Sequence, residues 1–461
     1  MRPRYSLRLT EFQHKALERH LFPGDGLEAV ALLVCGRREG DKDHIFTTRR
    51  VIPVPYEVCD RSANRVTWPT DFVDSILKDE YGKRQAIIRV HSHPQQYPKF
   101  SEIDDESDRR LFESVCNFQD DGLSHASAIM LPTGQLIART VTNGTPGEEL
   151  SSVSVVGDDL RISSSTTTST DIPSHAVRHA QVFGQRTTNL LREVSAAVIG
   201  CSGTGSIVVE QLARLGIGKL VLIDPETVED KNLNRVLNSG KEDAYLSRFK
   251  VHVLASAIAR MGFGQEVLPM PVNLASKLAI LAAAECHVLF GCMDGSEGRH
   301  LLNRIATFYC QPYFDVSVRL EADGSGGIAA VAGAVHYLQP GRSSLLSRGV
   351  YSMAQVEAEE MRRVNPELYQ RQLGEGYIRG VLEDRPAVIS INTFFASLMV
   401  NEFLARLHPY RNRPNSDFSY IGGNLAEGVL FTEPEQTPCV TLSKHVGRGD
   451  VSPLLDRPIL S

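Results

Sequence analysis

The sequence predicts an α/β protein with two domains. Its 461 residues exceed the roughly 100–200 residues of a single domain, and 42% hydrophobic against 23% charged residues is the balance of a globular chain. Short apolar runs of strand length alternate with stretches of helical period in both halves. The Ser/Thr-rich stretch RISSSTTTSTD holds almost nothing that can pack. We therefore expect domains at 1–150 and 176–461, joined by a linker at 151–175.

Charge and hydropathy argue against two classes of partner. The chain holds 49 Lys+Arg against 55 Asp+Glu, so the basic excess typical of nucleic-acid-binding proteins is absent. No run approaches the roughly 18 apolar residues of a membrane span, and the start of the chain lacks the apolar core of a signal peptide. Eight cysteines without a C-x-x-C pair fit a reducing compartment. We expect a cytoplasmic protein that binds neither nucleic acid nor membranes.

Two apolar runs in the first half are short enough for buried strands. ALLVCG follows Glu28, and AIIRVHSH extends from Ala86 to His93. The next segment, SEIDDESDRRLFESV, predicts a helix, because acidic residues fill its first turn and Ser101 precedes it as a candidate N-cap. Strands followed by a helix favour a mixed α/β domain.

The second of these strands predicts a metal site. Residues two apart on a strand point to one face, so His91 and His93 lie side by side. Ten residues then separate His93 from Asp104, enough to return its carboxylate to the pair. Two imidazoles and one carboxylate are the three ligands of a catalytic zinc, with Glu28 as candidate proton acceptor. Alternatively, Ser101 and Asp104 form only a capping box, which needs no metal.

The pattern E…H-S-H-P…S-x-x-D resembles the JAMM motif of JAB/MPN metalloproteases, whose best-known members remove ubiquitin from proteins. The resemblance covers the first domain. It implies a Zn²⁺ ion held by His91, His93 and Asp104, with Glu28 as general acid and base. It also implies that Ser101 supports the oxyanion as the scissile carbonyl becomes tetrahedral.

A glycine-rich turn opens the second domain. VSAAVIGCSGTGSIVVEQLARLGIGKLVLID predicts strand, turn, helix and strand, the start of a Rossmann-like fold. Gly200, Gly203 and Gly205 let the backbone approach a phosphate at the helix N-terminus, and Asp224 ends the next strand, where an acid can bind ribose. This turn alone suits NAD as well as ATP. It also suits a turn that only packs a strand against a helix.

Polar and cationic residues after the acid favour ATP. Asn234, Arg235 and Lys250 have no evident use in a dehydrogenase, whereas an enzyme that releases pyrophosphate must neutralise its charge. Asp294 ends the apolar run HVLFGCMD, where its carboxylate can hold Mg²⁺. The alternative for Arg235 and Lys250 is an ordinary solvated surface.

These motifs together resemble the ThiF/MoeB/ubiquitin-activating (E1-like) superfamily over about residues 176–461. Its members adenylate the C-terminal carboxylate of a ubiquitin-like protein. The resemblance implies that the three glycines cradle the phosphates, that Asp224 holds the ribose and that Asp294 binds Mg²⁺. It assigns the triphosphate contacts to Asn234, Arg235 and Lys250.

Two further features fit the superfamily less closely. Arg186, in FGQRTTNLL, is a weaker match to an early arginine that reaches the nucleotide of a partner subunit. Members are usually dimers, so we expect a homodimer. In PGRSSLLSRG, serines stand where related sequences carry two cysteines. The acyl group therefore passes either directly from the adenylate to a partner's thiol or through an oxyester on Ser344 or Ser347.

The two halves predict a bifunctional enzyme that acts on one ligand. The first half cleaves a ubiquitin-like precursor or conjugate, and the second adenylates its carboxylate with ATP and Mg²⁺. The expected partners are a ubiquitin-like protein and an E2-like conjugating enzyme, as in prokaryotic operons of this kind, some linked to antiviral defence. The alternatives are activation of a sulfur carrier for thiocarboxylate formation, and a chain in which one half only binds. An NAD-dependent oxidoreductase is a more distant third.

Overall fold

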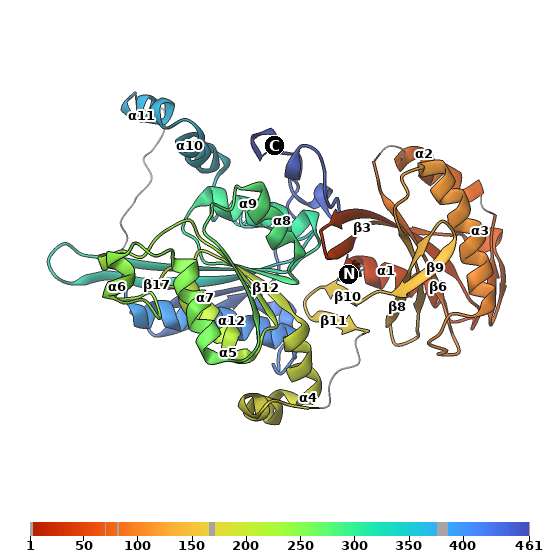
Figure 1. Cartoon of the computed structure of the whole chain (residues 1–461), viewed down its shortest axis with the longest axis horizontal. Helices are drawn as coiled ribbons and strands as arrows, with labels where there is room; N and C mark the ends of the chain where they lie inside the picture. Colours follow the sequence, from red (N-terminus) through yellow and green to blue (C-terminus); the bar gives the residue numbers. More distant parts are fainter. Residues whose placement is uncertain (1–2, 70, 81–82, 166–170, 376–385, 461) are drawn as a thin grey trace. The chain divides into compact units, whose positions relative to one another are not determined.

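The chain folds into two compact units (Figure 1). The computed structural model describes residues 3–69, 71–80, 83–165, 171–375 and 386–460. The first unit comprises Met1–Thr167 with Phe308–Cys310 and His445–Ser452, and the second comprises Thr168–Thr307, Gln311–Lys444 and Pro453–Ser461. Both units are α/β, as the sequence predicted.

The first unit is built on a nine-stranded mixed sheet. Its strands, in spatial order, are β11 (Leu160–Ser164), β10 (Ser152–Val156), β1 (Arg4–Thr10), β3 (Asp43–Pro53), β2 (Val30–Glu39), β6 (Ala86–Ser92), β7 (His125–Met130), β8 (Leu136–Thr142) and β9 (Thr145–Glu149). β2 and β6 are antiparallel neighbours, and every residue of β6 is buried. A separate hairpin consists of β4 (Asp60–Ser62) and β5 (Arg65–Thr67).

Helices cover both faces of this sheet. They are α1 (Glu11–Leu21), α2 (Asp71–Glu80) and α3 (Glu102–Gln119). Leu17 and Leu21 of α1 pack on one face of β2, and apolar residues of α2 and α3 pack on the other. Since β2 and β6 are covered on both faces, their sequences are nearly continuous apolar runs.

The first unit extends further along the chain than the sequence indicated. Residues 152–164, which we expected in a linker, form the hairpin of β10 and β11, and β10 pairs in parallel with β1. Val153 and Val155 join the core of this unit. The alternation of valine with serine in β10 is strand-like, but the Ser/Thr-rich composition that follows hid it. Residues 166–170 of the expected linker lie outside the described residues.

The second unit holds an eight-stranded sheet. In spatial order its strands are β14 (Glu266–Met270), β13 (Lys219–Ile223), β12 (Ser195–Ile199), β15 (Val288–Gly291), β16 (Tyr313–Ala322), β17 (Ile328–Leu338), β18 (Tyr420–Asn424) and β19 (Val429–Glu433). Strands β14 to β16 are parallel, and β16 to β19 are antiparallel. Because β12 lies between β13 and β15, the strand order reverses there, and open α/β sheets bind ligands at such a point.

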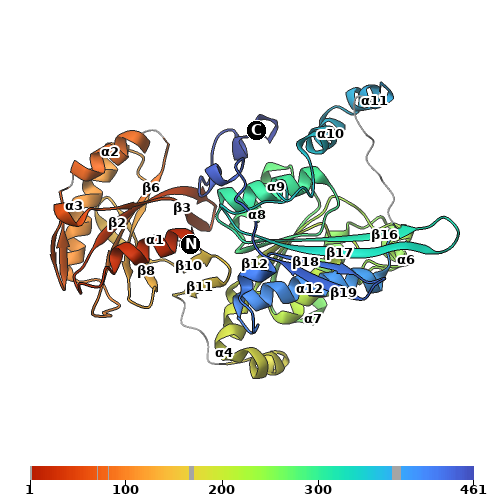
Figure 2. The same cartoon turned by 180° about the vertical axis from the view of Figure 1, so that it is seen from behind.

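The second unit also contains helices. They are α4 (Val177–Glu193), α5 (Gly205–Leu215), α6 (Lys241–Tyr245), α7 (Lys250–Met261), α8 (Lys277–Glu285), α9 (Ser296–Phe308), α10 (Met353–Val364), α11 (Pro366–Gly374) and α12 (Ile389–Leu407). Figures 1 and 2 show α8 and α9 on one face of the sheet, with α5, α7 and α12 on the other. Phe395, Met399 and Phe403 of α12 are fully buried, which accounts for the apolar sequence of this helix.

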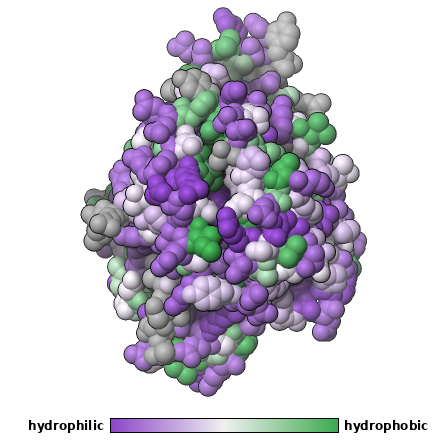
Figure 3. Space-filling view, turned by 90° about the vertical axis from the view of Figure 1, so that its right-hand side faces the viewer, coloured by the Kyte–Doolittle hydropathy of each residue, from purple (hydrophilic) through white to green (hydrophobic). Residues whose placement is uncertain are grey.

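The surface drawn in Figure 3 is mostly hydrophilic, and its hydrophobic residues lie in small separate groups. Single exposed apolar side chains are ordinary on folded proteins. Within the described ranges, the structure contains no helix that is both long and apolar enough to span a bilayer.

The turn from β12 to α5 requires glycine at two positions. Gly200 has a φ of 85°, a left-handed conformation that favours glycine. A Cβ atom added to Gly205 would lie 1.7 Å from the carbonyl oxygen of Gly200. The two ends of the turn therefore touch through their backbones, and this contact starts α5 directly beneath the turn.

Replacing Gly205 with alanine is expected to destabilise the second unit by roughly 1–3 kcal/mol or more, because the turn must open to admit a methyl group. Denaturant unfolding would measure this change. Gly374→Ala is the matched control, since a Cβ atom there meets nothing within 4 Å. If the two variants had the same free energy of unfolding, the close backbone contact in the turn would be contradicted.

Candidate functional site

The first unit gathers two histidines and a carboxylate at the end of β6. His91 Nε2 lies 2.8 Å from Asp104 Oδ1 and 3.0 Å from His93 Nε2. His93 Nε2 lies 3.7 Å from Asp104 Oδ2. All three residues are buried, and among the residues that the structure describes they form the one group of three or more such side chains that could hold a metal ion.

The donor atoms of this cluster suit Zn²⁺. His93 Nδ1 lies 2.7 Å from the carbonyl oxygen of Tyr97, and donation to that oxygen leaves Nε2 free to bind a metal. Burial lowers the pKa of His91 to about 4, so its imidazole is neutral at pH 7. Burial alone would raise the pKa of Asp104, but hydrogen bonds with His91 and His93 outweigh this effect. The net pKa of Asp104 lies well below its ordinary value, so its carboxylate is charged. His91 and Asp104 are therefore in the ligand forms that zinc requires. Burial lowers the pKa of His93, but its hydrogen bonds with Asp104 and Tyr97 raise it overall, so a metal at Nε2 would have to displace a proton.

Asp104 both faces the histidines and caps its own helix. Its Oδ2 accepts hydrogen bonds from the backbone N–H of Ser101 at 2.9 Å and from the Ser101 hydroxyl at 2.8 Å. Oδ1 is left to face His91. The capping box and the metal-ligand group are therefore compatible. In this arrangement the Ser101 hydroxyl donates to Asp104 Oδ2, and its role at an oxyanion stays a prediction.

Glu28 lies beside the cluster, just before β2. Its Oε1 is 3.9 Å from His93 Nε2, and the residue is 5% exposed. Its backbone is fixed, since its N–H donates to Ser62 and its carbonyl oxygen accepts from Arg61. Burial raises the pKa of Glu28 to about 7, and the charge of Asp104 adds to the rise while His93 opposes it. A carboxyl group of this pKa can take up and release a proton at neutral pH.

A buried ion pair behind the cluster was not predicted. Arg89 shares a face of β6 with His91, and its Nη1 donates to Asp108 Oδ1 at 2.8 Å. Its Nη2 lies 3.6 Å from Asp104 Oδ1. Asp108 is fully buried, one helical turn after Asp104, and also accepts from Arg139 at 2.7 Å. These contacts hold α3 against β6 and keep Asp104 in place. Strand alternation could have indicated Arg89.

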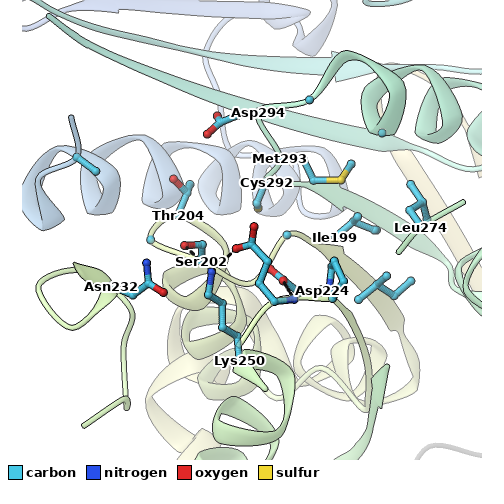
Figure 4. A pocket seen from close by; sticks show the side chains of 18 of the residues that line it. Ile199, Ser202, Thr204, Asp224, Asn232, Lys250, Leu274, Cys292, Met293 and Asp294 are labelled. Carbon is cyan, nitrogen blue, oxygen red and sulfur yellow. Dashed lines mark hydrogen bonds and ion pairs between the residues drawn. The ribbon is translucent and has the colours of Figure 1, made fainter. Parts of the chain in front are cut away.

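The second unit holds a cavity of about 530 Å³ where β12, β13 and β15 end (Figure 4). The glycine-rich turn lines it through Gly200, Gly203 and its neighbours, and Asp224 lines it after β13. Asp294 lies across the cavity from Lys250 (Figure 4). Mg²⁺ commonly binds through one or two carboxylates together with substrate phosphates, so Asp294 fits the expected donor.

Asp224 ties the glycine-rich turn to the next loop. Its Oδ2 accepts from the backbone N–H of Cys201 at 2.6 Å, and its Oδ1 accepts from that of Glu226 at 2.8 Å. Burial raises the pKa of Asp224, while the charge of Lys250 opposes the rise. The carboxylate therefore fixes the backbone around the cavity.

Lys250 is 2% exposed and lies beside the glycine-rich turn (Figure 4). Its Nζ pairs with the carboxylate of Glu226 and lies 3.5 Å from the Ser202 hydroxyl. Glu226 was not predicted, although its place two residues after Asp224 could have indicated it. Arg235 donates to the side-chain oxygen of Asn234 at 3.0 Å. Arg235 and Lys250 both line the cavity, so the expected cations lie together.

Three residues expected at the nucleotide lie outside the lining of the cavity. Asn234 is exposed and bound by Arg235, while Asn232 lines the cavity in its place. Gly205 is buried under the turn and supports Gly200. Arg186 is exposed on α4. The sequence Asn232-Leu233-Asn234-Arg235 holds two asparagines and could not decide between them, because the short 3₁₀ turn Asp230–Asn232 sets which one faces inward.

Ser344 and Ser347 cap each other. The backbone N–H of Ser344 donates to the Ser347 hydroxyl at 2.9 Å, and that of Ser347 donates to the Ser344 hydroxyl at 3.2 Å. Ser344 is also buried. Within the described part of the chain no histidine or carboxylate is hydrogen-bonded to either hydroxyl, so neither serine has the base that an oxyester step needs.

The raised pKa of Glu28 predicts a pH-dependent stability in protein stripped of metal. Between the ordinary pKa of 4.5 and the folded value of about 7, folding takes up a proton, so this contribution to stability is lost as pH rises through 7. The free energy of unfolding of Glu28→Gln, relative to that of the wild type, should therefore rise by roughly 1–3 kcal/mol from pH 5 to pH 8, as denaturant unfolding would measure.

Glu57→Gln, at an exposed carboxyl of the same unit, is the control and should show no such gain. A constant difference between Glu28→Gln and the wild type at both pH values would contradict the environment described for Glu28.

Comparison with known families agrees with both predicted domain types. Residues 176–427 match the ThiF family, and residues 13–142 match the prokaryotic homologues of the JAB domain. The first range covers more than half of the chain.

Individual relatives match a part of the chain. Ubiquitin-like modifier-activating enzyme 5 of Caenorhabditis elegans is 27% identical over 165 residues, 33% of this chain and 37% of that protein. The adenylyltransferase and sulfurtransferase MOCS3 of Mus musculus is 32% identical over 129 residues, 28% of each chain. The chain thus spans about a third of the length of these relatives.

Solved structures of E. coli MccB also align with the chain. The crystal structure with succinimide covers 59% of this chain and 74% of that one, at 16% identity and a TM-score of 0.44. On the family matches, the chain belongs to the ThiF family and carries a prokaryotic homologue of the JAB domain before its ThiF domain.

Proposed function

We propose that the chain is a bifunctional enzyme acting on the C-terminus of a ubiquitin-like protein. The first unit hydrolyses a precursor or conjugate with Zn²⁺, and the second adenylates the freed carboxylate with ATP and Mg²⁺. One observation carries this proposal. The same chain contains a buried cluster of two histidines and an aspartate, and a cavity lined by the glycine-rich turn and by the cationic side chains of Arg235 and Lys250. The name of the relative from Caenorhabditis elegans, a modifier-activating enzyme, supports the same substrate class.

In the hydrolytic half, His91, His93 and Asp104 would hold the metal. Bound zinc supplies an activated water by lowering its pKa from about 15.7 to about 7. Glu28 is the nearby group whose raised pKa would let it take up a proton at its carboxylate and release it to the leaving amine. Arg89 and Asp108 hold Asp104 in position from behind, and they touch neither substrate nor metal.

Zinc binding and turnover should separate in two variants. Wild-type protein should keep one zinc per chain after dialysis, and His91→Ala/His93→Ala should lose it. Glu28→Gln should keep the zinc and lose about 100-fold or more of its cleavage rate, the usual weight of a general base. Metal analysis and cleavage of a ubiquitin-like protein with a C-terminal extension measure the two effects.

His252→Ala, at an exposed histidine of the second unit, is the control for metal content. Full zinc in the double variant would remove the cluster as the metal site, and unchanged cleavage by Glu28→Gln would remove Glu28 as the base.

In the synthetic half, a carboxylate oxygen of the substrate attacks the α-phosphorus of ATP, and the bond from that phosphorus to pyrophosphate breaks. Lys250 and Arg235 line the cavity and would neutralise the charge on the departing pyrophosphate. Asp294 is the carboxylate for Mg²⁺, which supplies further neutralisation. Asp224 acts by fixing the backbone of the turn, and it lines the cavity where a ribose would lie.

Asp294→Ala should lower ATP–pyrophosphate exchange by about 100-fold or more, because the site would lose the carboxylate that holds Mg²⁺ and with it part of the neutralisation of the triphosphate charge. Glu242→Ala is the control, since Glu242 is an exposed carboxylate outside the cavity lining. Exchange at the wild-type rate in Asp294→Ala would rule out Asp294 as the Mg²⁺ ligand.

The step after adenylation has two candidate acceptors. The first is the thiol of an E2-like conjugating enzyme, reached directly from the adenylate, since Ser344 and Ser347 lack a base. The second is a sulfur donor, which would make a thiocarboxylate. The name of the Mus musculus relative, an adenylyltransferase and sulfurtransferase, is the reason to consider a sulfur donor as an acceptor. We further propose a cytoplasmic homodimer, with Arg186 reaching the partner's nucleotide, and a role in antiviral defence.

A further inference from the structure

The side chain of Asn392 is an element of the nucleotide cavity that the sequence motifs do not include. Asn392 lies in the first turn of α12, almost 190 residues beyond the glycine-rich turn in sequence, and lines the cavity. It is 5% exposed. The apolar sequence of α12 gives the other buried side chains of this helix a place in the core, but it gives no reason for an amide here.

The amide of Asn392 lies over the middle of the glycine-rich turn. A Cβ atom added to Gly203 would come within 2.5 Å of Asn392 Nδ2 and within 3.0 Å of Arg235 Cδ. Asn392 and Arg235 are thus side by side at the same glycine. The absence of a side chain at Gly203 leaves room for both, and a phosphate bound by the turn would meet both.

This amide has no protein partner. The backbone N–H of Asn392 donates to the carbonyl oxygen of Val388, but the structure gives its side chain no hydrogen bond to any described residue. On the same helix, the exposed Asn401 donates from its amide to Ser397 at 2.9 Å. The residue is buried but its side chain lines the cavity, so its unpaired amide is available to a ligand there.

The start of α12 supplies a second positive feature at the same place. Val388 precedes the helix, and no side chain caps its first N–H groups. Those groups carry the positive end of the helix dipole, which favours an anion. Arg235 and Lys250 also line the cavity, so donors from three segments of the chain face it. The lining also holds carboxylates, among them Asp294 and Glu226, and Glu226 pairs with Lys250.

We propose that the Asn392 amide and the start of α12 bind the terminal phosphates of ATP, opposite the glycine-rich turn. The proposal rests on the proposed adenylation and adds a phosphate contact to that site. The amide donates to phosphate oxygens that Arg235 also faces, so α12 holds the part of ATP that departs as pyrophosphate. Adenosine and AMP lack these phosphates and gain nothing from Asn392.

Calorimetric titration of the full chain with Mg·ATP, AMP and adenosine tests this contact. Asn392→Asp keeps the shape of the side chain and sets a negative charge against the phosphates, so it should weaken ATP binding about tenfold or more. Binding of AMP and adenosine should change less than about twofold. An acid in the first turn favours the helix, so this variant is expected to fold. Asn392→Ala, which only removes the donor, should weaken ATP binding by about threefold to tenfold.

Asn401→Asp is the matched control, because it makes the same change on an exposed part of α12, and it should bind ATP as the wild type does. ATP binding within twofold of wild type in Asn392→Asp would overturn the proposal, as would an equal loss of ATP and AMP. If wild-type protein bound no ATP, the proposed adenylation would fail with it. If the wild type binds ATP and Asn392→Asp binds it equally well, the contact with Asn392 is rejected while the proposed adenylation stands.

Discussion

Two buried carboxylates hold the backbone of the sites in which they lie. Asp104 accepts from the N–H and hydroxyl of Ser101, and Asp224 accepts from the N–H groups of Cys201 and Glu226. A buried carboxylate is costly unless it is hydrogen-bonded, so these bonds fix both the carboxylate and the backbone that donates to it. Each site is consequently in place before any ligand arrives.

The same constraint explains where the sites lie. Both are at the carboxyl end of a fully buried strand, β6 in the first unit and β12 in the second, where the chain turns into a helix start. The strand supplies rigidity, and the helix start supplies free N–H groups that a carboxylate or a phosphate can accept. In the first unit the capping box uses this helix start, because Asp104 accepts from the N–H of Ser101 and the Ser101 hydroxyl accepts from the N–H of Asp104. In the second, the turn is left open to the cavity.

Local patterns predicted the parts of each site that lie close together in sequence. Alternation along β6 placed His91 and His93 on one face, and the glycine spacing placed the turn before α5. Longer-range partners had no such pattern. Asp108 pairs with Arg89 across two elements, and Asn392 reaches Gly203 from a helix whose sequence indicates only a core. The pairing of β10 with β1 was missed for the same reason, since strand partners are chosen by tertiary packing.

The central claim is that two preformed sites in one chain take a metal and a nucleotide independently. A crystal structure grown with Zn²⁺ and Mg·ATP, with anomalous diffraction recorded at the zinc edge, tests it most directly. The account predicts a zinc peak bound by both imidazoles and Asp104, together with ATP whose phosphates lie along the glycine-rich turn. A zinc peak away from this trio, or a nucleotide bound elsewhere on the second unit, would contradict it.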